Sequence, residues 1–212
     1  LRTISPVEKS LASINLPMSL PTCYQGSVTQ FDSVLLSFGK KWTNIYILAD
    51  ENTKVDCLPI LLEHSQELQQ ANLLVLDPGE EVKTLEIAES LWSSLLETGA
   101  DRKSLVINLG GGVVTDLGGF VASTFKRGID FIHIPTTLLA QVDAAIGGKT
   151  GVNLDYSKNQ VGTFAHPLFV FTDIGFLRTL PQREFLSGLG EVIKYGLILD
   201  KDLFNLLTDK QG

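Results

Sequence analysis

The stretch SLVINLGGGVVTDLGGFVAST, residues 104–124, decides the fold of this chain. Residues 104–109 form the short apolar run typical of a fully buried strand, three glycines follow directly, and residues 113–124 have a helical pattern. Glycine has no Cβ, so the backbone can turn sharply here and approach a bound group closely. A helix that begins after such a turn offers free N–H groups and a positive dipole end to an anion. The pattern predicts either a tight turn without a ligand or a phosphate-binding turn.

Two common nucleotide-binding motifs do not fit this stretch or the one that follows it. The fingerprint G-x-G-x-x-G fails because Thr115 stands where the third glycine is required. The later GGKT is not a P-loop, because Asp143 occupies the position of the first P-loop glycine. A nucleotide site in this chain must therefore be built differently.

Apolar runs alternate with helical patterns along the first 135 residues. Strands are predicted at 45–49, 73–76, 104–109 and 131–134, and helices at 53–70, 85–97 and 113–124. This alternation predicts an α/β fold with a mainly parallel sheet and helices on both faces. Ligands of such sheets gather at the carboxyl ends of the strands. We expect one shared site there from the residues that follow predicted strands, namely Asp50, Gly111, Gly112, Thr136 and Thr137.

The pattern changes after Phe171, and residues 181–207 are helical in character. We predict two domains, residues 1–177 and residues 178–212. The second is expected to be the start of a helical domain that this chain contains only in part.

Composition narrows the class of function. The chain of 212 residues is 44% apolar, which is enough for a core, and no apolar run reaches the ~18 residues of a membrane span. Residues 1–17 lack the continuous apolar stretch of a signal peptide, and two cysteines are too few for a disulfide framework, so a cytoplasmic location is expected. A net charge of −7 argues against nucleic acid as a partner. The cations that lie near glycines and threonines suit a small anionic ligand: Arg127, Lys149, Lys158 and Lys194.

Several charged residues admit both a functional and a structural interpretation. Lys149, flanked by glycines in IGGKTGVN, is either an anion contact or a surface lysine, and Lys158 with Asn159 could equally form a polar loop. Arg127 follows the helix at 113–124, and its positive charge could have only the structural role of stabilising the C-terminal end of that helix. Asp143 lies in the apolar stretch LLAQVDAAIGG, where a carboxylate is costly to bury unless it is paired.

Glu191 and Lys194 are three residues apart on a predicted helix and share one face. They are either an exposed ion pair or, because GLGEVIKYGLIL is so apolar, part of a buried site in which Glu191 binds a metal. The spacing of His64, His133 and His166 completes no metal site, and no HExxH motif or cysteine cluster is present. The residues alone therefore do not establish a metal.

Five segments together resemble the 3-dehydroquinate synthases of the sugar-phosphate cyclase superfamily: GGGVVTDLGGF, FKRGIDFIHIPTTLLAQVDAAIGGKTGVN, KNQVGTF, FLRTLPQRE and GLGEVIKYGLI. The resemblance runs from about residue 45 to 200 and is most specific over 108–200. It implies a Rossmann-like NAD domain, then an α-helical domain that binds a divalent metal, with the active site between them. Gly190, where alanine is common, and His133, where glutamine is common, depart from the family pattern.

The resemblance also implies roles for individual residues. The NAD site would comprise Asp50, Asn52, Glu80, Lys83, Gly111, Gly112, Val113, Asp116, Thr136, Thr137, Lys149, Lys158 and the run Phe176, Leu177, Arg178 and Thr179. The catalytic and substrate-binding residues would be Arg127, Asp143, Lys149, Asn159 and Lys194. Glu191 would be the first metal ligand, and the other two, both histidines, would lie beyond Gly212.

The implied activity is a step of the shikimate pathway, the conversion of a seven-carbon sugar-acid phosphate to 3-dehydroquinate and phosphate. It would proceed by transient oxidation by NAD, phosphate elimination, re-reduction and aldol closure, with zinc or cobalt as the metal and a homodimer as the assembly. The 212-residue chain alone is expected to be inactive. The alternatives are a sister cyclase of the 2-epi-5-epi-valiolone synthase type, an alcohol dehydrogenase of the glycerol dehydrogenase type, and an inactive NAD-binding fragment.

Overall fold

The computed structural model describes residues 21–209 and contains a six-stranded sheet in which every pair of neighbouring strands is parallel. In spatial order the strands are β1 (Thr22–Gln25), β8 (Phe169–Thr172), β5 (Asp130–Pro135), β4 (Leu105–Gly110), β2 (Ile45–Asp50) and β3 (Asn72–Leu76). The predicted α/β fold with a mainly parallel sheet is confirmed.

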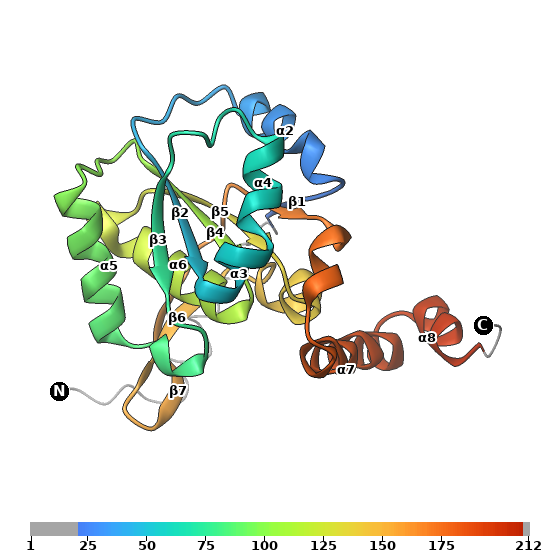
Figure 1. Cartoon of the computed structure of the whole chain (residues 1–212). Coiled ribbons are helices and arrows are strands. Elements are labelled where there is room, and N and C mark those ends of the chain that lie inside the picture. The colour runs from blue at the N-terminus through green and yellow to red at the C-terminus, as the bar shows by residue number, and fades with distance from the viewer. Residues whose placement is uncertain (1–20, 210–212) are drawn as a thin grey trace, which may run out of the picture.

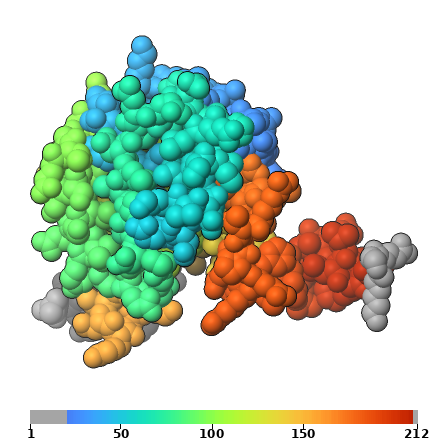
Figure 2. Space-filling model, viewed as in Figure 1, coloured from blue at the N-terminus to red at the C-terminus, as the bar shows by residue number. Residues whose placement is uncertain are grey.

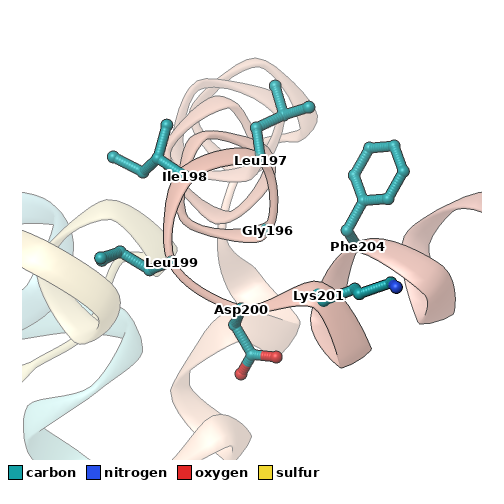
Figure 3. A pocket seen from close by; sticks show the side chains of 7 residues that line it. All are labelled: Gly196, Leu197, Ile198, Leu199, Asp200, Lys201 and Phe204. Atoms are coloured by element: carbon teal, nitrogen blue, oxygen red, sulfur yellow. The ribbon is translucent and has the colours of Figure 1, made fainter.

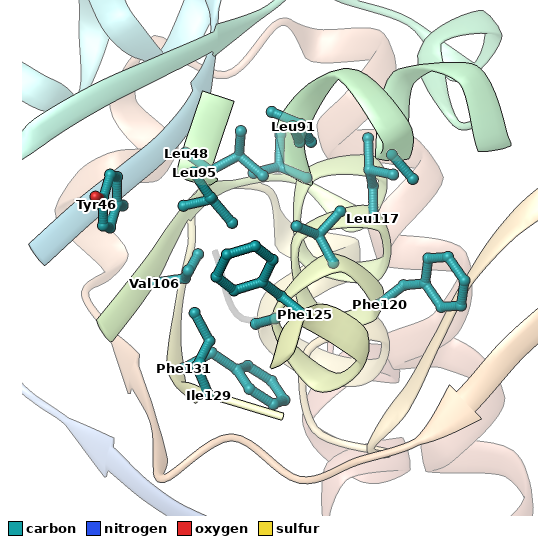
Figure 4. Packing of buried hydrophobic residues seen from close by; sticks show 14 of the residues in the cluster. Tyr46, Leu48, Leu91, Leu95, Val106, Leu117, Phe120, Phe125, Ile129 and Phe131 are labelled. Atoms are coloured by element: carbon teal, nitrogen blue, oxygen red, sulfur yellow. The ribbon is translucent and has the colours of Figure 1, made fainter. Parts of the chain in front are cut away.

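Helices cover both faces of this sheet (Figure 1). On one face lie α2 (Phe31–Ser37), α3 (Glu51–Asp56) and α4 (Leu58–His64), and on the other α5 (Leu85–Glu97) and α6 (Gly112–Thr124). Because side chains alternate along a strand, β2 and β4 supply both cores. Ile47 and Ile107 face the first core, whereas Leu48 and Val106 face Leu91, Leu95 and Leu117 in the second (Figure 4).

β4 is one of the two central strands, and all six of its residues are buried. Its buried position explains why its sequence is a continuous apolar run instead of an alternating one. The strand ends at Gly110, and α6 begins two residues later. The glycine turn is therefore held in the middle of the carboxyl edge of the sheet.

Two predicted helices are each divided in the structure. The helix predicted at 53–70 is replaced by α3 and α4, which end at His64, because Pro59 lacks an N–H and its ring conflicts with the carbonyl four residues earlier in a continuous helix. Residues 181–207 form α7 (Gln182–Ile198) and α8 (Lys201–Thr208). Asp200 separates this pair by accepting hydrogen bonds from the backbone N–H groups of Asp202 and Leu203.

The remaining elements were not predicted from the sequence. β6 (Lys149–Leu154) and β7 (Ser157–Phe164) form an antiparallel hairpin that packs on α6. Lys149 is thus the first residue of a strand, and Lys158 and Asn159 lie in β7 rather than in a polar loop. β1, α2 and β8 were also not predicted. The 3-10 helices are η1 (Val28–Gln30), η2 (Glu80–Val82), η3 (Phe125–Arg127) and η5 (Ile174–Thr179), and η4 (Ala140–Ala144) is a π-helix that carries Asp143.

α7 and α8 extend away from the body of the molecule (Figures 1 and 2). α7 approaches η4 at Gly188, where a Cβ would lie 2.5 Å from the backbone nitrogen of Leu139. Most apolar side chains of α7 and α8 are exposed, among them Leu197 and Leu206. Among residues 21–209, no helix has both the length and the apolar character that a membrane span requires.

Candidate functional site

A cavity of about 940 Å³ lies at the carboxyl ends of β2, β4 and β5. The chain passes from β2 outward to β3 and then returns to β4 on the other side of β2, so the crevice opens where the strand order reverses. The predicted residues that line it are Asp50, Asn52, Glu80, Lys83, Gly111, Gly112, Val113, Asp116, Thr136, Thr137, Lys158, Asn159, Phe176 and Thr179. The structure therefore brings together residues that are up to 129 positions apart in sequence.

The glycine turn forms one wall of this cavity. Gly111 is the N-cap of α6, and within the described residues no side chain caps this helix end. A Cβ on Gly111 would lie 2.9 Å from Cγ2 of Thr137, and the backbone nitrogen of Thr136 donates to the carbonyl of Gly110 at 3.0 Å. The turn is thus packed against the segment after β5, and the first N–H groups of α6 face a cavity that could hold an anion.

Asp50 fixes the opposite wall. It ends β2 and is the N-cap of α3, where its carboxylate accepts hydrogen bonds from the backbone nitrogen of Thr53 at 2.7 Å and from its hydroxyl at 2.9 Å. This reciprocal capping box anchors the start of α3 beside the cavity.

Lys83 joins three elements at the wall of the cavity. Only 3% of this residue is exposed, and its Nζ lies 2.5 Å from Oδ2 of Asp116 on α6 and 2.6 Å from Oδ1 of Asn159 on β7. Burial raises the pKa of the Asp116 carboxyl, and the Lys83 ammonium partly offsets that effect. An ammonium this deeply buried requires such partners, so the pair locks η2, α6 and the hairpin together.

A second cavity of about 550 Å³ adjoins the first and shares Asp116, Ala144 and Asn159 with it. It contains two more of the predicted substrate residues, Asp143 and Lys149. Asp143 accepts a hydrogen bond of 2.6 Å from the hydroxyl of Tyr195 on α7. That bond is the main cause of the raised pKa of Tyr195, a residue that no sequence pattern had singled out.

Five predicted residues line neither cavity: Arg127, Leu177, Arg178, Glu191 and Lys194. Arg127 follows the far end of α6, a helix of 13 residues that spans about 20 Å from the glycine turn. Leu177 and Arg178 belong to η5, whose neighbours Phe176 and Thr179 do line the larger cavity. The roles assigned to these five residues stay predictions.

Glu191 and Lys194 form an ion pair on α7. The spacing of three residues places both side chains on one helix face, so the structure contains the ion pair that the sequence left open, and the metal role of Glu191 stays a prediction. The contact with Glu191 raises the pKa of Lys194. Within residues 21–209, no three His, Cys, Asp or Glu side chains are grouped closely enough to hold a metal ion. The described residues thus do not form a complete metal centre.

Other residues of the larger cavity carried no sequence signal that we recognised. Cys57 lies between α3 and α4 and lines the wall, and burial raises the pKa of its thiol to about 12, so it is neutral at ordinary pH. Arg183 and Glu184, in the first turn of α7, also line the cavity. In the sequence, only the closeness of Arg183 and Glu184 to the FLRT segment indicated that they could line this cavity.

A third hollow, of about 300 Å³, lies apart from the other two at the turn between α7 and α8 (Figure 3). Its walls include Leu197, Leu199 and Phe204, with Asp200 and Lys201 at the turn. It shares no residue with the two cavities described above.

Comparison with known proteins places this chain among enzymes of one family. The model of the family described as 3-dehydroquinate synthase N-terminal matches residues 73–187. A 3-dehydroquinate synthase from Parabacteroides distasonis is 51% identical over 158 residues, which cover 74% of this chain and 44% of that protein. One from Ruminiclostridium cellulolyticum is 42% identical over 206 residues, covering 93% of this chain and 56% of that protein. The chain thus spans about half the length of these curated relatives.

Solved structures agree with the sequence comparison. A 2-deoxy-scyllo-inosose synthase complexed with carbaglucose-6-phosphate, NAD⁺ and Co²⁺ has a TM-score of 0.78 at 28% identity, covering 85% of this chain and 51% of that one. A 2-epi-5-epi-valiolone synthase from Streptomyces hygroscopicus with NAD⁺ and Zn²⁺ bound has a TM-score of 0.77 at 28% identity, covering 98% of this chain and 53% of that one. Together with the matched family model, these likenesses show that the chain belongs to the 3-dehydroquinate synthase family.

Proposed function

We propose that the larger cavity binds NAD and that the protein acts as a 3-dehydroquinate synthase. The observation that carries this proposal is the convergence of Asp50, the open N-terminus of α6 and the Lys83 network on one crevice at the strand reversal. Related enzymes bind NAD⁺, according to the descriptions of two of their structures. Curated relatives at 42%, 51% and 54% identity are described as 3-dehydroquinate synthases, which favours this activity over that of the sister cyclases at 28%.

Different residues of the cavity would bind different parts of the dinucleotide. The N–H groups at Gly112 and Val113 would bind the pyrophosphate, because they lie at the positive end of an uncapped helix. Asp50, at the end of β2, would accept hydrogen bonds from the adenosine ribose. Thr136 and Thr137 would fix the part of the cofactor nearest the smaller cavity. When bound, NAD supplies a reversible hydride acceptor, and the protein orients it.

The smaller cavity would hold the substrate, 3-deoxy-D-arabino-heptulosonate 7-phosphate. Lys149 is exposed at its edge and would bind the carboxylate or the phosphate of this anion. Asn159 borders both cavities, so it can contact substrate while its Oδ1 is held by Lys83. Asp143, oriented by Tyr195, would accept hydrogen bonds from the hydroxyl groups of the substrate.

The rest of the assignment extends beyond the described residues. We propose that residues 1–177 form the NAD domain and residues 178–212 begin the α-helical domain. The proposed metal role of Glu191 needs further ligands that residues 21–209 do not provide, so no chemical step is assigned to a metal here. A homodimer in the cytoplasm, acting in the shikimate pathway, completes the proposal.

Calorimetric titration of the chain with NAD, with and without zinc, tests this function. We expect NAD binding in both conditions and no turnover of the sugar phosphate by these 212 residues. Gly112→Ala offers a sharp probe, since its Cβ would meet only Ala144, at an ordinary 3.5 Å, and would extend into the cavity. It should weaken NAD binding at least about tenfold, a cost of about 1.4 kcal/mol.

Gly190→Ala is the matched control, because Gly190 lies on α7, lines neither cavity and has open space where a Cβ would be. It should leave NAD binding unchanged. Folded wild-type chain without detectable NAD binding, or equal affinities for the two variants, would contradict the proposal.

A further inference from the structure

Asn153 occupies an irregular position in the β6–β7 hairpin. The antiparallel register shifts between Val152, which faces Val161, and Leu154, which faces Ser157. Between these two pairs the single residue Asn153 of β6 lies opposite three residues of β7, 158–160, so the extra residues of the bulge belong to β7. A bulge frees backbone groups from the ladder. From this position Asn153 contacts η2 and the residue that follows it.

Three polar groups of Asn153 contact different partners beside the cavities. Its backbone nitrogen donates to the carbonyl of Lys83 at 2.8 Å, and its Nδ2 donates to Oε1 of Glu80 at 3.0 Å. Its Oδ1 accepts from the backbone nitrogen of Asn159 at 2.9 Å. A side-chain amide both donates and accepts, so it can satisfy a carboxylate and an N–H group at once.

The bond to Asn159 holds an uncommon backbone conformation. Asn159 has φ of 55°, in the left-handed region, which asparagine tolerates better than most residues other than glycine. Lys83 holds the Oδ1 of Asn159 at 2.6 Å, while Asn153 holds its backbone nitrogen. These two restraints together fix the direction of a side chain that borders both cavities.

We propose that Asn153 is a positioning residue that orients Glu80 and Asn159 for the cofactor and substrate without lining either cavity itself. The inference rests on the proposed NAD site. It adds a residue to which no role has been assigned. Removing the side chain should leave the fold intact and weaken NAD binding.

Separate contacts keep the hairpin docked without Asn153. The hydroxyls of Ser123, Thr163 and Thr150 form a chain, with 2.7 Å between Ser123 and Thr163 and 2.6 Å between Thr150 and Thr163. Thr150 is buried and packs against Gly119 of α6. These contacts lie near the open end of the hairpin, whereas the bulge lies near its turn. Loss of the Asn153 side chain should therefore change the orientation of Glu80 and Asn159 without undocking the hairpin.

The first test compares Asn153→Ala with Asn44→Ala by NAD calorimetry, thermal unfolding and amide hydrogen exchange. Asn44 is the matched control, because its side chain is also half-buried and hydrogen-bonded to backbone, at the carbonyl of Gly99, but it lies away from both cavities. Losing two hydrogen bonds should weaken NAD binding about tenfold in Asn153→Ala only. The amide of Asn159 should also exchange faster in that variant.

The second test separates positioning from loss of packing. Asn153→Asp keeps the acceptor for Asn159 but places a carboxylate against Glu80, so NAD affinity should fall at least as far as in Asn153→Ala. Adding Glu80→Gln restores a donor–acceptor pair in the reverse direction, and the double variant should bind NAD more tightly than Asn153→Asp alone.

The outcomes are distinct from those of the functional proposal. If the wild-type chain does not bind NAD, the proposed function fails. If it binds NAD and Asn153→Ala binds equally well, or if the double variant binds no better than Asn153→Asp, the positioning role is overturned.

Discussion

His133 should make the protein sensitive to mild acid. It lies in β5, is 3% exposed, and its Nδ1 is 3.2 Å from Nδ2 of Asn108 on β4. Burial lowers its pKa from 6.5 to about 3, because the charged imidazolium would be cut off from water. The folded protein therefore keeps this side chain neutral at pH values where the unfolded chain protonates it.

The sign and size of the effect follow from proton linkage. The unfolded state binds more protons between pH 6.5 and about 3, so stability falls as the pH decreases through that window. Each pH unit costs about 1.4 kcal/mol for one proton, so lowering the pH from 7 to 5 should remove about 2 kcal/mol through His133 alone. His133→Gln keeps an amide that can hydrogen-bond to Asn108 and cannot be protonated in this range.

Urea unfolding of the wild type and His133→Gln at pH 7 and pH 5 measures this difference. From pH 7 to pH 5 the wild type should lose about 2 kcal/mol more of its free energy of unfolding than His133→Gln does. This difference does not depend on how stable the two proteins are at pH 7. His64→Gln is the control, because His64 is exposed at the end of α4 and should give the wild-type profile. Parallel pH profiles for the wild type and His133→Gln would refute the reasoning.

Three further substitutions test the site and the core. Lys149→Ala should lower kcat/KM of the active holoenzyme roughly 10- to 100-fold while changing stability by less than about 0.5 kcal/mol, and a large fall in melting temperature would instead indicate a structural role. Glu191→Gln should abolish tight metal binding with NAD affinity nearly intact, so stoichiometric zinc retained in that variant would overturn the metal assignment. Gly118→Ala should cost roughly 1–3 kcal/mol in urea unfolding, because a Cβ would lie 1.8 Å from Oδ1 of Asn108 and 2.8 Å from Cδ2 of Leu48; unchanged stability would contradict this packing.

The hairpin shows why part of the candidate site could not be read from the sequence as structure. Lys149, Lys158 and Asn159 were identified from their residue types and from the family resemblance, yet their strands were not predicted. β6 and β7 contain residue types that normally mark turns, namely Gly151, Asn153, Asn159 and Gly162, so no apolar alternation is visible. The close pairing of Gly151 with Gly162 becomes favourable only when α6 supplies a surface on which the hairpin packs.

Local pattern determined the main elements of this protein by itself. The apolar run at 104–109, the glycine turn and the helical pattern after it predicted β4 and α6. Apolar periodicity and the backbone freedom of glycine can both be read from residue type and spacing. Tertiary structure decided which distant groups meet. The contacts of Lys83 with Asp116 and Asn159, of Tyr195 with Asp143, and of Asn153 with Glu80 join segments 33 to 76 residues apart. Such partners are fixed by strand order and helix packing, which bring side chains together only after the chain has folded.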